Sequence, residues 1–301
     1  MHSNHLEKLS GVFPPCMTVF DGNEEVDYGG IARNVERYNE TGLKGYMPLG
    51  SNGEFRSLSD EESVKIVEVY ERTMAQGKTL IAGVGRESAK ITIEFIKRIA
   101  DKGVDYATVL PPFYFVNFMT DDALIRYYTR IADESPVPVM MYNAPKFAAG
   151  LTFSTSLVAT LAAHPNIAGM KDTSKEDIAV YIDAVPKGAD FCVMAGSIEK
   201  FYSGLLKGAI GGVLSIANYL PELCCRLQEL HQTGKRAEAE KLDCYARGLS
   251  KNAAGNHGVA GVKAAMDLLG YRGGNPRNPL LPLADEAKEQ LKAVLQQEGL
   301  L

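Results

Sequence analysis

The stretch IAGMKDTS at residues 167–174 holds a short apolar run that ends in a lysine, Lys171. An apolar run of this length, followed at once by polar residues, is typical of a buried strand that ends at the edge of a sheet. An ammonium group held there loses water and gains apolar neighbours, which disfavours its charged form and lowers its pKa. A neutral amine attacks carbonyl carbon, so Lys171 is a candidate for Schiff-base chemistry. The alternative is a lysine whose side chain extends from the strand end into solvent.

The composition is that of a globular protein with a full core. Of the 301 residues, 46% are hydrophobic and 23% are charged, and the formal net charge is −5. Without a basic block or an acidic tail, we expect neither nucleic acid nor a membrane surface as a partner. The chain has no apolar run of the ~20 residues that a membrane span requires, and its first residues lack a signal-peptide pattern. Five cysteines without a CxxC pair indicate reduced thiols, so we expect a cytoplasmic protein.

Short apolar runs alternate with amphipathic helical stretches about eight times along the chain. This alternation predicts an α/β protein with a closed barrel, the (β/α)8 TIM barrel. The predicted strands span residues 12–19, 45–49, 80–84, 107–110, 137–141, 167–171, 191–195 and 210–216. Three helical segments and no strand pattern follow residue 235, at residues 237–249, 259–269 and 285–297. We therefore predict a catalytic barrel over residues 1–234 and a C-terminal helical extension over residues 235–301.

The carboxyl ends of the strands are where a β/α barrel carries its chemistry. Lys171 is the only lysine at such a position among the predicted strand ends. Tyr142 ends the preceding strand, and its phenol could pass protons while an amine adds to a carbonyl and water leaves. The alternative for Tyr142 is a core tyrosine held by one hydrogen bond. Tyr114 follows two prolines and could point into the pocket or across a subunit contact.

A polar turn, Gly50-Ser51-Asn52-Gly53, follows the second predicted strand. Its glycines permit close approach of the backbone, and its N–H groups could hold a carboxylate. Ser51 and Asn52 would add side-chain donors. A plain turn between a strand and a helix favours the same residue types, so this turn alone does not establish a site.

Neither metal nor nucleotide chemistry finds support in the sequence. The histidines His164, His231 and His257 fall outside the predicted strand ends, and no cluster of ligand residues has metal spacing. There is no GxGxxG pattern and no P-loop. We therefore expect no metal and no cofactor.

Together these strand ends resemble the dihydrodipicolinate synthase and N-acetylneuraminate lyase family of pyruvate-dependent class I aldolases, from about Gly11 to the C-terminus. The resemblance implies a TIM barrel with a C-terminal helical extension, no metal, a covalent imine with the substrate in place of a cofactor, and a homotetramer built as a dimer of dimers. The motifs that carry it are Gly50-Ser51-Asn52-Gly53-Glu54, Tyr142-Asn143-x-Pro145, residues 167–172, Ala195-Gly196-Ser197 and Gly211-Gly212-Val213.

The resemblance also implies roles for single residues. Lys171 matches the Schiff-base lysine, and Tyr142 matches the catalytic tyrosine. Ser51 and Asn52 match the pair that binds the pyruvate carboxylate, and Ser51 keeps the hydroxyl of the proton relay. Tyr114 matches a tyrosine that, in some members, extends across a dimer interface to the neighbouring subunit. We assign three further residues to substrate binding, namely Gly196, Ser197 and Ile216.

The chain departs from the synthases of this family after the Tyr142 turn, where Lys146 and Phe147 stand in place of an arginine that holds the second substrate's carboxylate. The Ser51-Asn52 pair, in place of two threonines, is more similar to 4-hydroxy-2-oxoglutarate aldolases. We therefore predict cleavage or formation of a 4-hydroxy-2-oxo acid, with pyruvate and an aldehyde as partners; for 4-hydroxy-2-oxoglutarate the aldehyde is glyoxylate. Two alternatives stay open. The first is another enzyme that forms the same imine, either a synthase or a dehydratase of a sugar-derived 2-oxo acid. The second is a non-catalytic barrel that binds an oxo acid.

Overall fold

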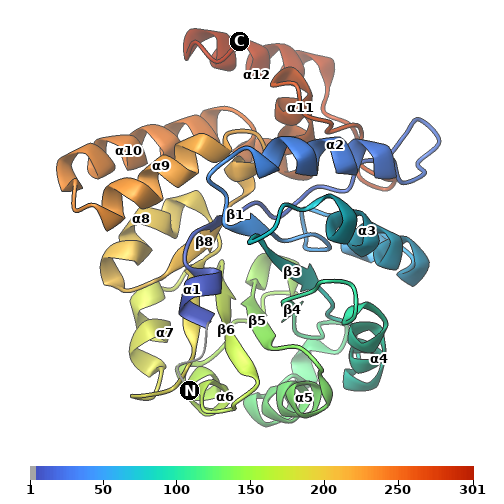
Figure 1. Cartoon of the computed structure of the whole chain (residues 1–301), viewed down its shortest axis with the longest axis vertical. Helices are drawn as coiled ribbons and strands as arrows, with labels where there is room; N and C mark the ends of the chain where they lie inside the picture. The colour runs from blue at the N-terminus through green and yellow to red at the C-terminus, as the bar shows by residue number, and fades with distance from the viewer. Residues whose placement is uncertain (1–4) are drawn as a thin grey trace. The chain divides into compact units, whose positions relative to one another are not determined.

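A computed structural model describes residues 5–301 of the chain, and strands alternate with helices along it as predicted (Figure 1). This order is that of a (β/α)8 TIM barrel followed by further helices, so the predicted fold class is confirmed. The strands are β1 (Val12–Phe13), β2 (Gly45–Tyr46), β3 (Thr79–Gly83), β4 (Tyr106–Val109), β5 (Val139–Asn143), β6 (Ile167–Asp172), β7 (Cys192–Ala195) and β8 (Gly211–Val213).

The chain folds as two compact units. The first holds residues 5–11 and Thr79–Val213, and the second holds Val12–Lys78 and Leu214–Leu301. The predicted division at residue 234 is a different one and stays a prediction. Each unit carries part of the predicted site.

The first unit is built on the parallel ladder from β3 to β8. Its strands are buried along their length, as parallel strands covered on both faces should be. In this ladder Tyr142 lies opposite Lys171, and Lys171 lies opposite Met194. The intervening helices are α4 (Ala89–Ile99), α5 (Asp121–Glu134), α6 (Thr155–Ala162), α7 (Ile178–Ala184) and α8 (Ile198–Lys207).

Polar caps explain where most of these helices begin. The side chains of Ser88, Thr120 and Ser154 accept the backbone N–H of the third helical residue, and Asp177 accepts that of the second. Such caps satisfy backbone donors that would otherwise have no partner at a helix start. Each cap therefore fixes the point at which the chain leaves the sheet edge and turns into a helix.

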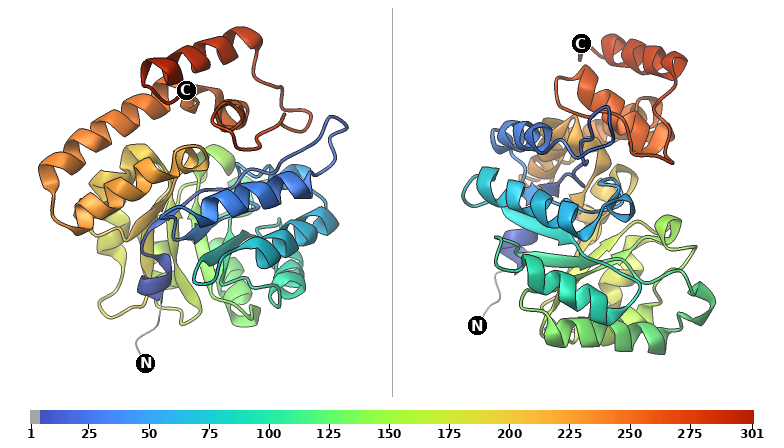
Figure 2. Two further views of the ribbon diagram at one scale, coloured as in Figure 1. Left: turned by 45° about the horizontal axis from the view of Figure 1, so that its top comes forward. Right: turned by 90° about the vertical axis from the view of Figure 1, so that its right-hand side faces the viewer.

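The second unit contains β1, β2 and the helices of the C-terminal part. The three helical segments predicted after residue 235 are confirmed, with ends shifted by a few residues for two of them. Figure 2 shows α9 and α10 side by side, and they pack against each other. The helices of this unit are α2 (Tyr28–Asn39), α3 (Asp60–Thr73), α9 (Pro221–Gln232), α10 (Arg236–Asn252), α11 (Gly258–Leu268) and α12 (Asp285–Gln297).

Three predicted strands, β1, β2 and β8, are shorter than expected by more than one residue, and β2 ends at Tyr46 instead of residue 49. β1 stops at Phe13 because Pro14 and Pro15 follow it, and proline has no N–H to donate to a ladder. β8 stops at Val213 because the chain turns into a short 3-10 helix, η4 (Ser215–Asn218). Ile216, predicted to end the eighth strand, therefore lies in this helical turn.

The sequence predicts no membrane span and reduced cysteines, and the structure bears on both the helices and the cysteines. Among the described helices, none combines the length and the apolar character that crossing a bilayer requires. All five cysteines are free thiols, as predicted. Burial raises the pKa of Cys16 and of Cys192 to about 12, which keeps both as unreactive thiols near neutral pH.

We expect Gly169→Ala to lower the free energy of unfolding by about 1–3 kcal/mol, because overpacking costs this much in a well-packed interior. A Cβ at this position of β6 would lie 2.2 Å from the carbonyl oxygen of Cys192 on β7. Chemical denaturation would measure the change. Gly248→Ala is the matched control, since nothing lies within 4 Å of a Cβ there and the residue is exposed in the C-terminal part of α10. The prediction is wrong if both substitutions have the same effect.

Candidate active site

Lys171 lies near the carboxyl end of β6 with only 4% of its surface exposed. Its neighbour Asp172 is reached by Lys200 of α8, with 2.6 Å between Nζ and Oδ2. Because successive side chains of a strand point to opposite faces, Lys171 points to the face of the sheet away from α8. The amine is therefore inside the fold, and the alternative of a side chain extended into solvent does not hold.

Tyr142 of β5 lies beside Lys171 on the same face, since the two residues are paired in the ladder. Tyr142 is also only 4% exposed, and Lys171 Nζ lies 4.2 Å from the centroid of its ring. Within residues 5–301, no carboxylate forms an ion pair with Lys171. The structure thus brings a buried amine and a phenol together, and it leaves the amine without a counter-ion in the part of the chain it describes.

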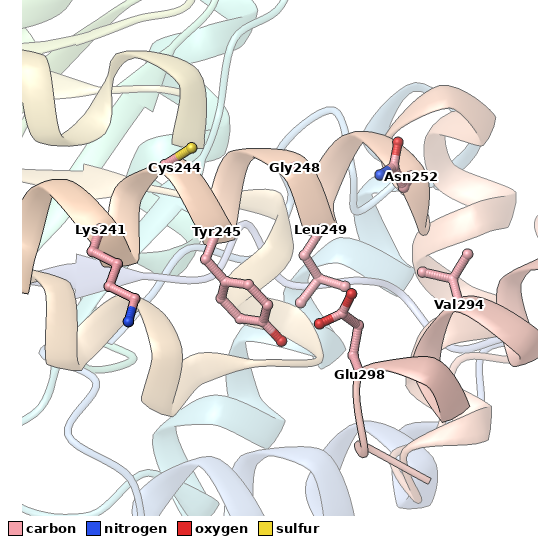
Figure 3. A pocket seen from close by; sticks show the side chains of 8 residues that line it. All are labelled: Lys241, Cys244, Tyr245, Gly248, Leu249, Asn252, Val294 and Glu298. Atoms are coloured by element: carbon pink, nitrogen blue, oxygen red, sulfur yellow. The ribbon is translucent and has the colours of Figure 1, made fainter.

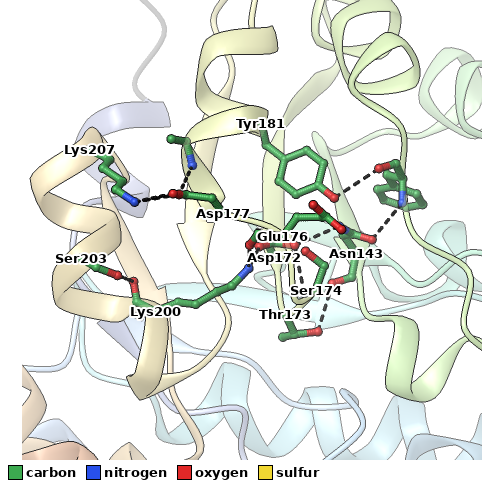
Figure 4. Close-up of polar contacts among 12 residues, drawn as sticks. Asn143, Asp172, Thr173, Ser174, Glu176, Asp177, Tyr181, Lys200, Ser203 and Lys207 are labelled. Atoms are coloured by element: carbon green, nitrogen blue, oxygen red, sulfur yellow. Dashed lines mark hydrogen bonds and ion pairs between the residues drawn. The ribbon is translucent and has the colours of Figure 1, made fainter.

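The side chain of Asp172 is fully buried and held by three donors (Figure 4). Asn143 Nδ2 and the Ser174 N–H donate to Oδ1 at 2.9 and 3.0 Å, and Lys200 Nζ donates to Oδ2 at 2.6 Å. A buried carboxylate is tolerated only with such partners, because burial removes its hydration. The contacts join β5, β6 and α8, so they fix the strand end on which Lys171 lies.

Gly196 and Ser197 follow β7 and lie next to the end of β6. The Gly196 N–H donates to the Asp172 carbonyl at 2.7 Å. A Cβ at Gly196 would lie 2.1 Å from Thr173 Cγ2, so only glycine permits this approach of the two strand ends. Ser197 precedes α8, but its side chain does not cap the helix. Contact of either residue with substrate stays a prediction.

The turn Gly50-Ser51-Asn52-Gly53 belongs to the second unit and is held from two sides. Thr18 Oγ1 donates to the Gly53 carbonyl at 2.7 Å, and Asn52 Nδ2 donates to Ser215 Oγ at 2.8 Å. Ser51 Oγ is buried and has no hydrogen-bond partner among residues 5–301. The turn therefore offers the Ser51 hydroxyl to a ligand, whereas the side-chain amide of Asn52 already donates one hydrogen bond, to Ser215.

Ile216 lies in η4, whose position is fixed by Asn218. Asn218 Nδ2 donates to the carbonyls of Ser215 and Pro15 at 3.0 and 3.2 Å. The phenol of Tyr38 donates to the Asn218 carbonyl at 2.6 Å. Ile216 itself is 2% exposed, and its predicted contact with substrate stays a prediction.

Tyr114 lies on the surface of the first unit, in the segment before a short 3-10 helix, η2 (Val116–Phe118). Its side chain is 77% exposed and meets Phe115 edge to face at 4.9 Å, and Phe118 nearby is 74% exposed. Within one chain the ring is thus open to solvent, unlike that of Tyr142. The predicted role of Tyr114 across a subunit interface stays a prediction.

The sequence analysis missed a buried ion pair next to the Ser51 turn. Glu54 directly follows the turn, and its Oε1 lies 2.7 Å from Nζ of Lys263 on α11. The exposed fractions of the two side chains are 1% and 0%. Burial lowers the pKa of Lys263, and Glu54 opposes this shift by raising it. The helix that was expected only to append to the barrel therefore contacts a predicted site segment.

A surface pocket of about 550 Å³ lies between α10 and α12, and none of the predicted site residues lines it (Figure 3). Its lining residues include Lys241, Tyr245 and Glu298. Over residues 5–301, no three His, Cys, Asp or Glu side chains are grouped closely enough to hold a metal ion.

Comparison with known proteins gives one family and several close relatives. The chain matches the dihydrodipicolinate synthetase family over residues 8–298. It is 31% identical to a probable mitochondrial 4-hydroxy-2-oxoglutarate aldolase of Emericella nidulans, over 94% of this chain and 93% of the relative. It is 32% identical to the L-threo-3-deoxy-hexylosonate aldolase of Hypocrea jecorina, over 96% and 94%. The crystal structure of YagE from E. coli K12, a prophage protein of the dihydrodipicolinic acid synthase family in complex with pyruvate, superposes with a TM-score of 0.89 at 29% identity, covering 97% of this chain and 99% of YagE.

We expect Lys200→Met to lower the free energy of unfolding by about 3–5 kcal/mol, because it leaves the buried Asp172 carboxylate without its cation. Lys207→Met is the matched control on the same helix. Lys207 pairs with Asp177 at 2.6 Å, but both side chains are exposed, so its loss should cost less than about 1 kcal/mol. Urea unfolding of the two variants measures the difference. Equal losses would show that the Asp172 contacts do not hold the strand end.

Proposed function

The chain belongs to the dihydrodipicolinate synthetase family and is an enzyme of the lyase type, and we propose that it is a Schiff-base-forming aldolase of 2-oxo acids. The observation that carries the proposal is the buried amine of Lys171, 4.2 Å from the ring of Tyr142. Desolvated amines with no counter-ion are suited to attack carbonyl carbon. The aldolase names of two relatives and the pyruvate bound to YagE support a 2-oxo acid as the substrate.

In the proposed mechanism, Lys171 Nζ attacks C2 of the 2-oxo acid to give a carbinolamine. Loss of water then gives a protonated imine, and Tyr142 gives and takes the protons that these steps require. The imine accepts the electron pair of the C3–C4 bond while the C4 hydroxyl loses its proton, so an aldehyde leaves and the pyruvate enamine remains. Protonation of the enamine at C3 and hydrolysis of the imine release pyruvate and restore the amine.

We propose that the turn that contains Ser51 and Asn52 binds the substrate carboxylate. The Ser51 hydroxyl is the free donor there, and it would also serve in the proton relay. The bond from the Asn52 side-chain amide to Ser215 fixes this residue, and we assign its backbone N–H to the carboxylate. A held carboxylate fixes C2 for attack, which is the orientation term of catalysis.

The specific substrate we propose is 4-hydroxy-2-oxoglutarate, which would give pyruvate and glyoxylate. The Ser51-Asn52 pair and the name of the Emericella relative support it. A synthase-type condensation is the second candidate, but Lys146 and Phe147 stand where the synthases carry an arginine. A dehydratase of a sugar-derived 2-oxo acid would share the imine.

We also propose a homotetramer in the cytoplasm. The aromatic side chains of Tyr114, Phe115 and Phe118 are exposed together, and apolar patches of this kind favour a subunit contact. The cytoplasmic location rests on the sequence alone, and the name of the Emericella relative places that protein in mitochondria.

We expect borohydride in the presence of pyruvate to trap one covalent adduct on Lys171 and to inactivate the enzyme. Lys171→Ala should form no adduct, whereas Lys175→Ala, which removes an exposed lysine four residues on, should form it as the wild type does. Tyr142→Phe should lower kcat by about 10²- to 10⁴-fold, the usual loss for a proton-transfer group. Intact-mass and peptide analysis locate the adduct. An adduct on Lys171→Ala would contradict the proposal.

We expect 4-hydroxy-2-oxoglutarate to give pyruvate with a kcat/KM at least about tenfold above that of a sugar-derived 4-hydroxy-2-oxo acid, since the site would be built for one of them. Pyruvate release coupled to lactate dehydrogenase measures both. A product that has lost only water would indicate the dehydratase instead. A complete lack of turnover on every 2-oxo acid, with pyruvate still bound, would indicate a non-catalytic barrel.

A further inference from the structure

We infer that Glu54 and Lys263 are positioning residues that hold the turn Gly50-Ser51-Asn52-Gly53 in the shape that binds the carboxylate of a 2-oxo acid. The inference rests on the proposed function, because it takes this turn as the carboxylate site. In this scheme neither residue touches the substrate. They act through the backbone and the free hydroxyl of the turn.

The backbone on both sides of the turn needs outside support. Leu49 precedes the turn with φ 61°, and Glu54 follows it with φ 53° and ψ 34°. Left-handed backbone is disfavoured for residues other than glycine, and it persists only where the surroundings over-determine it. The shape of the turn is therefore set by its contacts.

Glu54 is the residue through which the turn is fixed to the C-terminal helices. Its Oε1 lies 2.7 Å from Lys263 Nζ, and its Oε2 accepts a hydrogen bond from the backbone N–H of Arg277 at 2.9 Å. Lys263 Nζ also donates to the carbonyl of Asn275 at 3.0 Å and lies 4.6 Å from the centroid of the Phe20 ring. Glu54 thus has an ion pair at Oε1 and a hydrogen bond at Oε2, and these two contacts restrict its side chain.

The other contacts of the turn complete this support. Thr18 holds the Gly53 carbonyl and Ser215 accepts from Asn52, whereas the Ser51 hydroxyl of this turn is buried and has no partner within residues 5–301. A buried hydroxyl without a partner costs free energy and calls for an explanation, such as a ligand that satisfies it. A donor that is already in place need not be ordered when the ligand binds, which favours affinity.

Stability alone is a poor explanation for this ion pair. Replacing a buried pair with apolar side chains of similar size is often neutral or stabilising, because both charges lose their hydration. Burial also lowers the pKa of Lys263, which shows that the charged form is disfavoured there. The pair lies directly beside the turn, and positioning of the turn accounts for its presence.

The test is the double variant Glu54→Gln/Lys263→Met, which leaves no unpaired charge in the interior. The probe is pyruvate, and the readout is the concentration that gives half of the maximal borohydride-trapped adduct on Lys171. We expect this concentration to rise about 10- to 100-fold, because a loosened turn no longer orients the carboxylate. The aldehyde concentration for half-maximal condensation and kcat at saturation should change by less than about threefold, because only binding common to ground and transition states is lost.

The matched control is Arg236→Met/Glu240→Gln, which removes an ion pair on α10 whose two side chains are 72% and 54% exposed. It should leave every readout at the wild-type value. If the double variant at Glu54 and Lys263 does not fold by circular dichroism, the same comparison applies to Glu54→Gln, which keeps an acceptor for Lys263. A folded variant that takes up pyruvate at wild-type concentrations overturns the inference alone. A wild type that forms no adduct overturns the proposed function, and this inference with it.

Discussion

The alternation of side chains along β6 is the constraint on which the candidate active site depends. Lys171 and Asp172 are adjacent, one basic and one acidic, yet their side chains point to opposite faces of the strand. Asp172 is neutralised by Lys200 of α8, so its charge is not available to Lys171. The ladder with β5 then places Tyr142, and no carboxylate, beside the amine. One strand thereby separates a structural ion pair from the lysine that we propose to be reactive.

Burial by itself does not distinguish a reactive lysine from a structural one. Lys263 is more deeply buried than Lys171, but it has Glu54 at 2.7 Å and a backbone carbonyl as partners. Lys200 is 17% exposed and has Asp172. Lys171 differs from both because the side chain found against its amine is an aromatic ring. The partner of each amine, and not the degree of its burial, is what supports the different role that we propose for Lys171.

The sequence predicted most of the strands because apolar runs are local patterns, and it predicted the neighbours Lys171 and Tyr142 because consecutive strands of a β/α barrel pair in chain order. It failed at the ends of β1 and β8, where Pro14-Pro15 and the turn into η4 override the apolar pattern. Lys263 was missed although it carries a readable signal. It lies between Val259 and Met266 at helical spacing, so a lysine occupies the apolar face of α11. Its partner, Glu54, was not predictable, because only the folded chain brings a distant turn to that helix.

The two parts of the candidate site are held by different kinds of interaction, and this difference determines how each can change. The backbone ladder and the fully buried Asp172 contacts hold the amine, so a change there shifts whole strands. Side chains hold the Ser51 turn, through Thr18, Ser215 and Glu54. A single substitution can alter one of these without disturbing the ladder, since each is a separate contact. The Lys171 part of the candidate site is therefore held by the sheet itself, whereas single substitutions can alter the contacts of the Ser51 turn.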